Sequence, residues 1–269
     1  MKHFSESNLA IVGTARNVAN YIQRVHKVLC KATINFRSQT FFVVESYSED
    51  STVDVLRAIA AKNKNFSFAS IESEREMPQL SVRIAQARNT AADMAFSYGP
   101  FDYVLVADLD NVNRNLTAPR LESCWKYPKW DMMSANQPHA YYDTWALRHP
   151  IISPGDCWRQ YEELLAYLPA ELAKKIAVTN RVISIPKSCP PIPVNSAFGG
   201  LAMYTADAYF DSSYSGLTSN GIEICEHVPF NQKLTNSGYK LYINPGLVNL
   251  NSIHQATIPI KTKLKKFLI

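Results

Sequence analysis

The sequence predicts an α/β protein whose mainly parallel sheet is flanked by helices. Short apolar segments alternate with amphipathic helical patterns over residues 1–110, and this alternation is typical of parallel strands joined by right-handed crossovers. A length of 269 residues allows one large domain, and 46% hydrophobic with 19% charged residues indicates an ordinary globular chain. We therefore expect a single α/β domain.

The first half of the chain contains predicted strands separated by predicted helices. Each strand is a short apolar run, whereas the helices carry apolar residues at a period of about 3.6. Ser51, Thr52 and Asp54 are suited to cap the start of the second helix. The strands are expected at 8–13, 40–44, 66–71 and 103–107, and the helices at 18–29, 52–59 and 80–98.

The regular alternation stops after Asp110. Four prolines between residues 186 and 193 predict a loop, because proline lacks the amide hydrogen that helices and sheets use. Pro229 suits the first turn of a helix that begins after Glu226. The other predicted elements are strands at 130–135, 201–204 and 239–243 and a helix at 156–168.

Positive charge is concentrated at the end of the chain. Four lysines between residues 261 and 266 supply most of the net charge of +5, so the body of the protein is near neutral. A broad nucleic-acid-binding face is therefore not expected. The tail, residues 256–269, mixes these lysines with large apolar residues. We expect it either to be solvated or to contact an anionic membrane surface.

Cysteine spacing and hydropathy indicate the cellular compartment. The five cysteines are scattered and form no C-x-x-C pair, which predicts free thiols in a reducing compartment. The N-terminal residues lack the apolar core of a signal peptide, and no segment reaches about 18 uninterrupted apolar residues. These features predict a cytoplasmic protein, which would be peripheral to a membrane if its tail binds lipid.

Two aspartates directly follow the fourth predicted strand. Asp108 and Asp110 flank Leu109, and alternate strand residues point the same way. Both carboxylates can therefore address one point beyond the carboxyl end of the strand, where open α/β sheets bind ligands. Hard oxygen ligands suit Mg²⁺ or Mn²⁺, with phosphate oxygens completing the coordination. The alternative is a solvated turn after the strand.

Several segments resemble, in order, motifs of the GT-A glycosyltransferases. The resembling segments are 43–52 (VVESYSEDST), 87–89 (ARN), 108–110 (DLD), 226–231 (EHVPFN), 238–240 (GYK) and His254. Glu45 departs from the pattern, because it stands where the family has an aspartate. The resemblance covers about residues 8–255. A narrower resemblance, carried by residues 142–148 (YDTWALR) and 15–17 (ARN), is to the fungal capsule-associated α-1,3-mannosyltransferases.

The resemblance implies a GT-A-like, Rossmann-type domain with two halves. Residues 1–125 would bind a nucleotide sugar, and residues 126–255 would bind the acceptor. A Mn²⁺ or Mg²⁺ cofactor would be held by Asp108, Asp110 and His254. The donor would be a UDP- or GDP-linked sugar. The residues that would contact it are Thr14, Arg16, Glu45, Arg88, Asn89, Asp108, Gly199 and Gly200.

Several of these roles have alternatives. Glu45 could bind a ribose hydroxyl or a base edge, or it could cap the following helix. The planar fork of Arg88 suits phosphate or carboxylate, but the residue could also lie on a helix surface. Asp143, Trp145 and Arg148 could contact donor sugar or acceptor, or they could form a core tryptophan beside a surface ion pair.

Glu226 and His227 occupy the position at which inverting relatives hold a general base. There a carboxylate deprotonates the acceptor hydroxyl. The usual Glu-Asp pair is Glu-His in this chain, so either His227 takes over, or Glu226 acts, or the enzyme retains configuration and needs no base. A helix-capping Glu226 beside a packing histidine is the structural alternative. Asp143 is a further candidate catalytic residue.

Together these features predict a metal-dependent glycosyltransferase that moves a hexosyl or deoxyhexosyl unit to a hydroxyl of a glycan or glycolipid. A sugar nucleotidyltransferase has similar sheet architecture, but it normally opens with a glycine-rich phosphate loop, and residues 13–17 contain one glycine. A non-catalytic glycan-binding module is a third alternative. The intact Asp108–Asp110 motif argues against that module.

Overall fold

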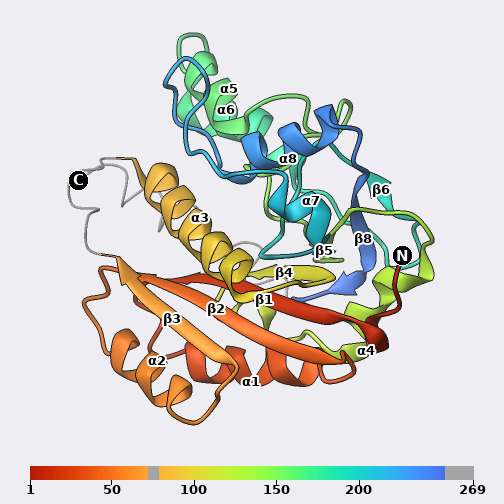
Figure 1. The fold of residues 1–269 in the computed structure, drawn as a ribbon. Helices are drawn as coiled ribbons and strands as arrows, with labels where there is room; N and C mark the ends of the chain where they lie inside the picture. The colour runs from red at the N-terminus through yellow and green to blue at the C-terminus, as the bar shows by residue number, and fades with distance from the viewer. Residues whose placement is uncertain (72–78, 252–269) are drawn as a thin grey trace.

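The computed structural model of the chain describes residues 1–71 and 79–251. Within these residues one eight-stranded sheet has the order β3-β2-β1-β4-β7-β5-β8-β6 (Figure 1). The strands are β1 (Asn8–Ala15), β2 (Ser38–Ser46), β3 (Phe66–Ile71), β4 (Tyr103–Ala107), β5 (Met132–Asn136), β6 (Ile192–Pro193), β7 (Leu201–Thr205) and β8 (Leu241–Val248). The α-helices are α1 (Ile22–Ala32), α2 (Thr52–Ala60), α3 (Leu80–Tyr98), α4 (Ala118–Glu122), α5 (Cys157–Leu164), α6 (Ala170–Ala177), α7 (Ala206–Phe210) and α8 (His227–Asn236).

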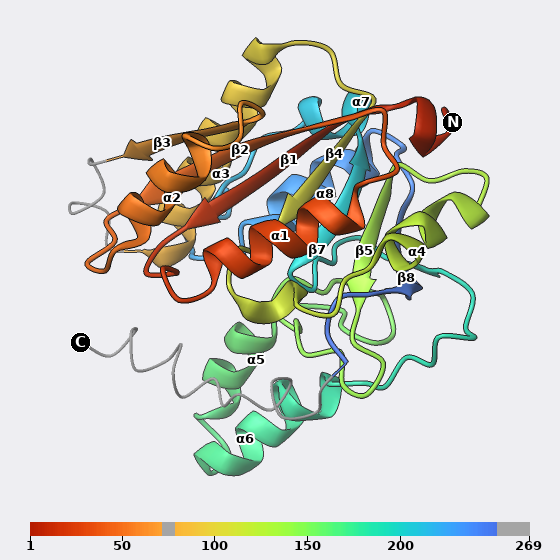
Figure 2. The same ribbon diagram turned by 90° about the horizontal axis from the view of Figure 1, so that it is seen from below.

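Helices cover both faces of the sheet (Figures 1 and 2). One face, which includes Ala10 and Val12 of β1, packs with α3, α7 and α8 in one apolar cluster. The opposite face, which includes Leu9 and Ile11, packs with α1 and α2 in a second cluster. Successive residues of β1 thus enter different cores, as expected of a strand buried on both sides. The predicted α/β sheet flanked by helices is confirmed.

Strand direction changes in the second half of the sheet. Parallel pairing joins β3, β2, β1 and β4, and β5 pairs in parallel with β8. β7 runs antiparallel between β4 and β5, and β6 runs antiparallel to β8. An apolar run has the same pattern in a parallel and in an antiparallel strand, so the sequence could not predict the antiparallel course of β7. The reversal places Leu201, at the start of β7, beside Ala107, at the end of β4.

Several element boundaries differ from those predicted. The strand predicted at 66–71 and the helix predicted at 80–98 coincide with β3 and α3. The helix predicted at 156–168 is split, because α5 ends at Leu164 and α6 starts after Pro169; proline disfavours the helical conformation in the residue before it. β8 runs on to Val248 beyond the predicted end. The sequence patterns do not predict α4, α6, α7 or β6.

Two expectations concern the chain as a whole. None of the helices in residues 1–71 and 79–251 is long and apolar enough to cross a bilayer. All five cysteines are free thiols, as their spacing predicted. His254 and the tail, residues 256–269, lie outside the described residues, so the metal-ligand role of His254 and the membrane contact of the tail stay predictions.

Candidate active site

The predicted aspartate pair lies at the carboxyl end of β4, beside the start of β7. Asp108 donates its backbone amide to the carbonyl oxygen of Gly200 over 3.0 Å, which extends the β4–β7 pairing. Leu109 is buried, whereas the Asp108 side chain is 33% exposed and Asp110 is exposed. Asp110 also accepts the amide of Val112 over 3.0 Å and so caps a short 3-10 helix at Asn111–Asn113.

Three buried amide side chains hold the backbone at this edge of the sheet. Asn113 donates to the carbonyl oxygen of Asp108 over 2.8 Å. Asn249 and Gln137 both donate to the carbonyl oxygen of Gly199, over 2.8 and 2.9 Å. Buried backbone carbonyls need such partners. Sequence reasoning missed these residues, because an asparagine or glutamine in an irregular segment gives no sign that it will be buried.

The Gly199-Gly200 pair has a backbone conformation that favours glycine. The φ angles are +68° and +82°, in the left-handed region that side chains disfavour. There is also no room for a side chain. A Cβ atom on Gly199 would lie 2.9 Å from the carbonyl oxygen of Ala135, and one on Gly200 would lie 2.6 Å from Val112 Cγ1. The pair therefore fixes the shape of the loop that faces Asp108.

Gly199→Ala is expected to destabilise the protein more than Gly221→Ala. Both residues have positive φ, but a Cβ on Gly221 would meet no atom within 4 Å. The difference isolates the steric clash, and overpacking of this kind costs about 1–3 kcal/mol. Urea denaturation of the two variants measures it. Equal losses of unfolding free energy would show that the loop at Gly199 yields to a methyl group.

Asp143 contributes a third carboxylate at this edge. Its Oδ2 accepts the backbone amide of Gly199 over 2.8 Å. The adjacent Tyr142 lies close enough to Asp143, Asp108 and Asp110 for all three carboxylates to raise the pKa of its phenol well above the ordinary value, with burial the largest cause. Tyr142 therefore keeps its proton at neutral pH and can donate a hydrogen bond at this site. Sequence reasoning did not assign it a role.

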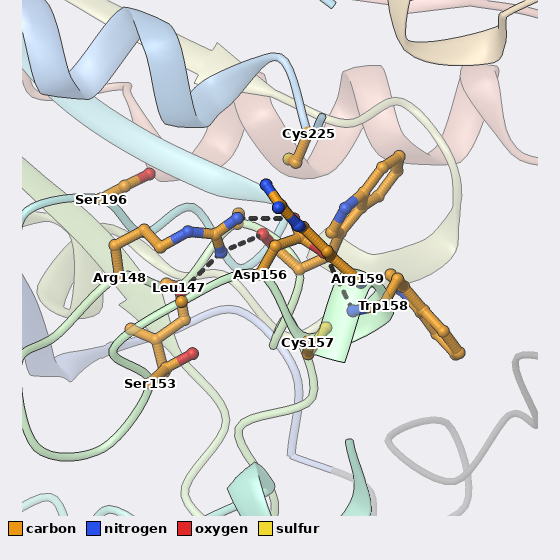
Figure 3. Close-up of polar contacts among 12 residues, drawn as sticks. Leu147, Arg148, Ser153, Asp156, Cys157, Trp158, Arg159, Ser196 and Cys225 are labelled. Carbon is orange, nitrogen blue, oxygen red and sulfur yellow. Dashed lines mark hydrogen bonds and ion pairs between the residues drawn. The ribbon is translucent and has the colours of Figure 1, made fainter. Parts of the chain in front are cut away.

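A buried arginine, Arg148, fixes the loop between Asp143 and α5, and Figure 3 shows its ion pair with Asp156. Arg148 donates Nη2 to Asp156 Oδ2 over 2.6 Å, and Nη1 to the carbonyl oxygens of Trp145 and Leu147 over 2.8 and 2.9 Å. Asp156 also accepts backbone amides at the start of α5. Arg148 thus joins the loop to α5 through an ion pair, but this pair is largely buried and is not the surface ion pair suggested by the sequence.

Glu226 and Asp108 lie on either side of Arg88. Arg88 donates Nε to Glu226 Oε1 over 3.0 Å and Nη2 to Asp108 Oδ1 over 3.1 Å. The arginine is 6% exposed and the glutamate 5% exposed. Burial alone would lower the pKa of Arg88, but the two carboxylates outweigh this effect and raise it. The structure therefore brings the predicted base position and the predicted metal motif together through one cation.

His227 is buried beside this ion pair. Its ring stacks on Phe198 with centroids 3.8 Å apart, and its Nε2 lies 3.6 Å from Glu226 Oε1. Within residues 1–71 and 79–251 neither ring nitrogen has a hydrogen-bond partner. Burial and the nearby charge of Arg88 lower the pKa of His227 well below 6.5. The ring is therefore neutral at neutral pH.

The buried, neutral state of His227 predicts a pH dependence of stability. In the unfolded chain the imidazole binds a proton at about pH 6.5, whereas in the folded protein it does not. Stability should therefore fall as the pH drops below about 6.5, by up to about 1.4 kcal/mol per pH unit from this residue. His227→Gln should remove that part of the slope in urea titrations between about pH 7.5 and 5.5.

His26→Gln is the matched control for this titration. The pKa of His26 is also lowered, by burial and then by Lys27, but its side chain is only partly buried. Its replacement should remove a smaller part of the slope than His227→Gln does. An unchanged slope in His227→Gln would mean that the folded protein protonates this ring.

Thr14, Arg16 and Glu45 lie at the carboxyl ends of neighbouring strands. Glu45 of β2 is paired in register with the last residue of β1, and Arg16 follows that residue and is exposed. The Glu45 carboxylate is buried and accepts the backbone amide of Ser48 over 2.6 Å. It therefore caps the turn after β2, and its proposed contact with a nucleotide stays a prediction.

Asn89 is oriented toward a different part of the chain. Its side-chain amide donates to the carbonyl oxygen of Tyr214 over 3.0 Å and accepts that residue's amide over 2.8 Å. Its predicted contact with a nucleotide stays a prediction.

In the described parts of the chain, no three His, Cys, Asp or Glu side chains are grouped to hold a metal ion. His254, the predicted third ligand, lies outside those parts.

No protein-family model and no curated protein matches the sequence, but solved structures match the fold. The mannosyltransferase PcManGT from Pyrobaculum calidifontis, in complex with GDP-Man and Mn²⁺, has a TM-score of 0.53 at 13% identity, over 92% of this chain and 57% of that one. TarS 1-349 from S. aureus has a TM-score of 0.49 at 13% identity, over 88% and 57%.

The match to the mannosyltransferase establishes the fold. At 13% identity it shows that the chain has the α/β fold of the GT-A-type glycosyltransferases, as the sequence motifs predicted. The chain spans 57% of the length of each of these two structures.

Proposed function

We propose that this chain is a metal-dependent glycosyltransferase, which moves a hexosyl or deoxyhexosyl unit from a UDP- or GDP-linked sugar to a hydroxyl of a glycan or glycolipid. One observation carries the proposal. A carboxylate of the strand-end motif, Asp108, and a carboxylate from the other half of the chain, Glu226, lie on either side of Arg88. With Asp108 on the donor side and Glu226 on the acceptor side, both substrates would meet at a single edge of the sheet.

The donor would bind at the carboxyl ends of β1, β2 and β4. Asp108 and Asp110 offer the hard carboxylate oxygens that Mn²⁺ or Mg²⁺ prefers, at an edge that is at least partly exposed. A cation held there would neutralise charge on the leaving nucleoside diphosphate. Thr14, Arg16 and Glu45 would contact base, ribose and phosphate. The complex of PcManGT with GDP-Man and Mn²⁺ supports this class of donor.

Glu226 would accept the proton of the acceptor hydroxyl. Its ion pair with Arg88 stabilises the ionised carboxylate, and its place at the N-terminal end of α8 adds the favourable field of the helix. His227 is neutral and stacked on Phe198, which supports a packing role. Asp143, bonded to the amide of Gly199, would shape the pocket for the transferred sugar.

Two assays in sequence test the proposal. Thermal shift with GDP, UDP and other nucleoside diphosphates, with and without Mn²⁺, identifies the base. A ligand at a hundredfold excess over its Kd should stabilise the protein by ~2.7 kcal/mol. Sugar nucleotides of that base are then assayed for release of the nucleoside diphosphate, with simple glycosides as acceptors.

The same assays separate the alternative functions. A glycan-binding module would show no Mn²⁺-dependent binding of any nucleotide. A sugar nucleotidyltransferase would instead release pyrophosphate from a nucleoside triphosphate and a sugar 1-phosphate. Either result would contradict the proposed transfer reaction.

A further inference from the structure

Arg88 connects two carboxylates that are far apart in the sequence. It lies within α3, Asp108 follows β4, and Glu226 precedes α8. The two ion pairs measure 3.1 and 3.0 Å, and they use different nitrogen atoms of the guanidinium group. Because this group is planar and rigid, its two bonds fix both the separation and the relative orientation of the two carboxylates. A lysine could not reproduce that geometry.

Aromatic rings restrict the guanidinium group further. Its carbon lies 5.0 Å from the centre of the Phe198 ring and 5.8 Å from that of Tyr214, within the range of cation–π attraction. The backbone of Tyr214 is in turn held by Asn89, the residue after Arg88. Phe198 also stacks on His227. The neighbours of Glu226 thus help to hold Arg88 in one rotamer.

One buried nitrogen atom of Arg88, Nη1, has no hydrogen-bond acceptor within residues 1–71 and 79–251. A buried unpaired donor costs about 1–3 kcal/mol, and native proteins keep few of them. An arginine whose only role is to stabilise the fold would be expected to have a hydrogen-bond acceptor for this nitrogen atom. The unpaired donor is therefore more consistent with a functional constraint on the site.

We propose that Arg88 is a positioning residue, which holds Asp108 on the donor side and Glu226 on the acceptor side in one preassembled arrangement. This inference rests on the proposed function. Arg88 would act on turnover through Glu226. Its loss should therefore lower kcat by about 100-fold, because a displacement of about 1 Å in a catalytic group can cost that much. KM for the donor should rise by a smaller factor.

The test compares Arg88→Met, Arg88→Lys, Glu226→Gln and the double variant Arg88→Met/Glu226→Gln. Turnover is measured as release of the nucleoside diphosphate, with the sugar nucleotide that the wild-type protein uses best. If Arg88 acts through Glu226, the double variant should be no slower than the slower single variant. Arg88→Lys keeps the charge and should recover part of the rate. KM for the donor is measured for every variant, because loss of a positioning residue should lower kcat more than it raises KM.

Arg181→Lys is the matched control for loss of a buried guanidinium group. Arg181 is 8% exposed and donates to Ser153, Gly155 and Gln160, and none of these is an ionised side chain. The Arg181→Lys variant should lose stability while its kcat and its KM for the donor stay at the wild-type values. Melting temperatures of all variants set an assay temperature at which each is folded. Arg88→Lys keeps the test valid if Arg88→Met does not fold.

The outcomes separate this proposal from the proposed function. If the wild-type protein is active and Arg88→Met and Arg88→Lys keep its kcat, the positioning role is wrong and the enzyme activity stands. If the losses in Arg88→Met and Glu226→Gln multiply in the double variant, Arg88 does not act through Glu226, and the proposal is also overturned. If the wild-type protein transfers no sugar, the proposed function fails, and the positioning role fails with it.

Discussion

Asp110→Ala is expected to abolish sugar transfer and Mn²⁺-dependent binding of GDP or UDP, while the fold stays intact. Asp110 is exposed at the strand end beside Asp108. The protein would supply few ligands to the cation, because the other coordination positions are taken by phosphate and water oxygens. Loss of one carboxylate should therefore remove most of the affinity. Calorimetric titration of GDP or UDP, with and without Mn²⁺, measures the effect directly.

A second variant separates the charge of Asp110 from its structural role. The Asp110 side chain caps the 3-10 helix at Asn111–Asn113 by accepting the amide of Val112, and loss of a helix cap costs about 1 kcal/mol. Asp110→Asn keeps a capping oxygen but removes the charge. It should therefore lose nucleotide binding with little loss of stability.

Asp54→Ala is the control for this experiment. Asp54 is an exposed aspartate whose ion pair with Arg57, at 3.2 Å, lies on the surface of α2. Its loss should leave nucleotide binding unchanged and should cost at most about 1 kcal/mol of stability, because Asp54 lies in the first turn of α2. Full transfer activity in Asp110→Ala, or in wild-type protein treated with EDTA, would contradict the metal role of the motif.

The sequence could predict β4 and the place of Asp108 and Asp110 directly after it, because the determinants of a strand are local. That both carboxylates address one point is inferred from the period of two along a strand and stays a prediction. Similarly, the limits of β3 and α3 follow from apolar periodicity between clear breaks. The approximate position of Glu226 before α8 follows from Pro229, which suits the first turn of a helix.

The remaining features of the site depend on contacts between distant segments. The sequence shows that Arg88 could bind phosphate or carboxylate, but only the packing of α3 against the rest of the fold places Asp108 and Glu226 around it. The burial of His227 results from Phe198, which comes from another segment. The antiparallel course of β7 likewise depends on the neighbours of that strand. Local patterns contain no information on such pairings.

Glu226→Gln is expected to lower kcat by roughly 10²–10⁴, with little change in donor affinity. The glutamine has the same shape and can still accept a hydrogen bond from Nε of Arg88, so that the bond between Arg88 and Asp108 should persist. What the variant loses is a carboxylate that can take a proton. A general base contributes to the transition state more than to donor binding, and the effect should therefore appear in kcat.

His227→Ala tests whether the neighbouring imidazole is the base instead. Because His227 is buried and neutral, its loss should lower stability through the empty space beside Phe198 and reduce kcat less than Glu226→Gln does. If the enzyme retains configuration, the effect of Glu226→Gln should be smaller, and NMR of the new linkage would show the donor stereochemistry preserved. Near-normal turnover in both variants would contradict a catalytic role for the pair. In that case Glu226 would serve to pair with the buried Arg88, because its side chain makes no capping hydrogen bond to α8, and Asp143 would become the next candidate catalytic residue.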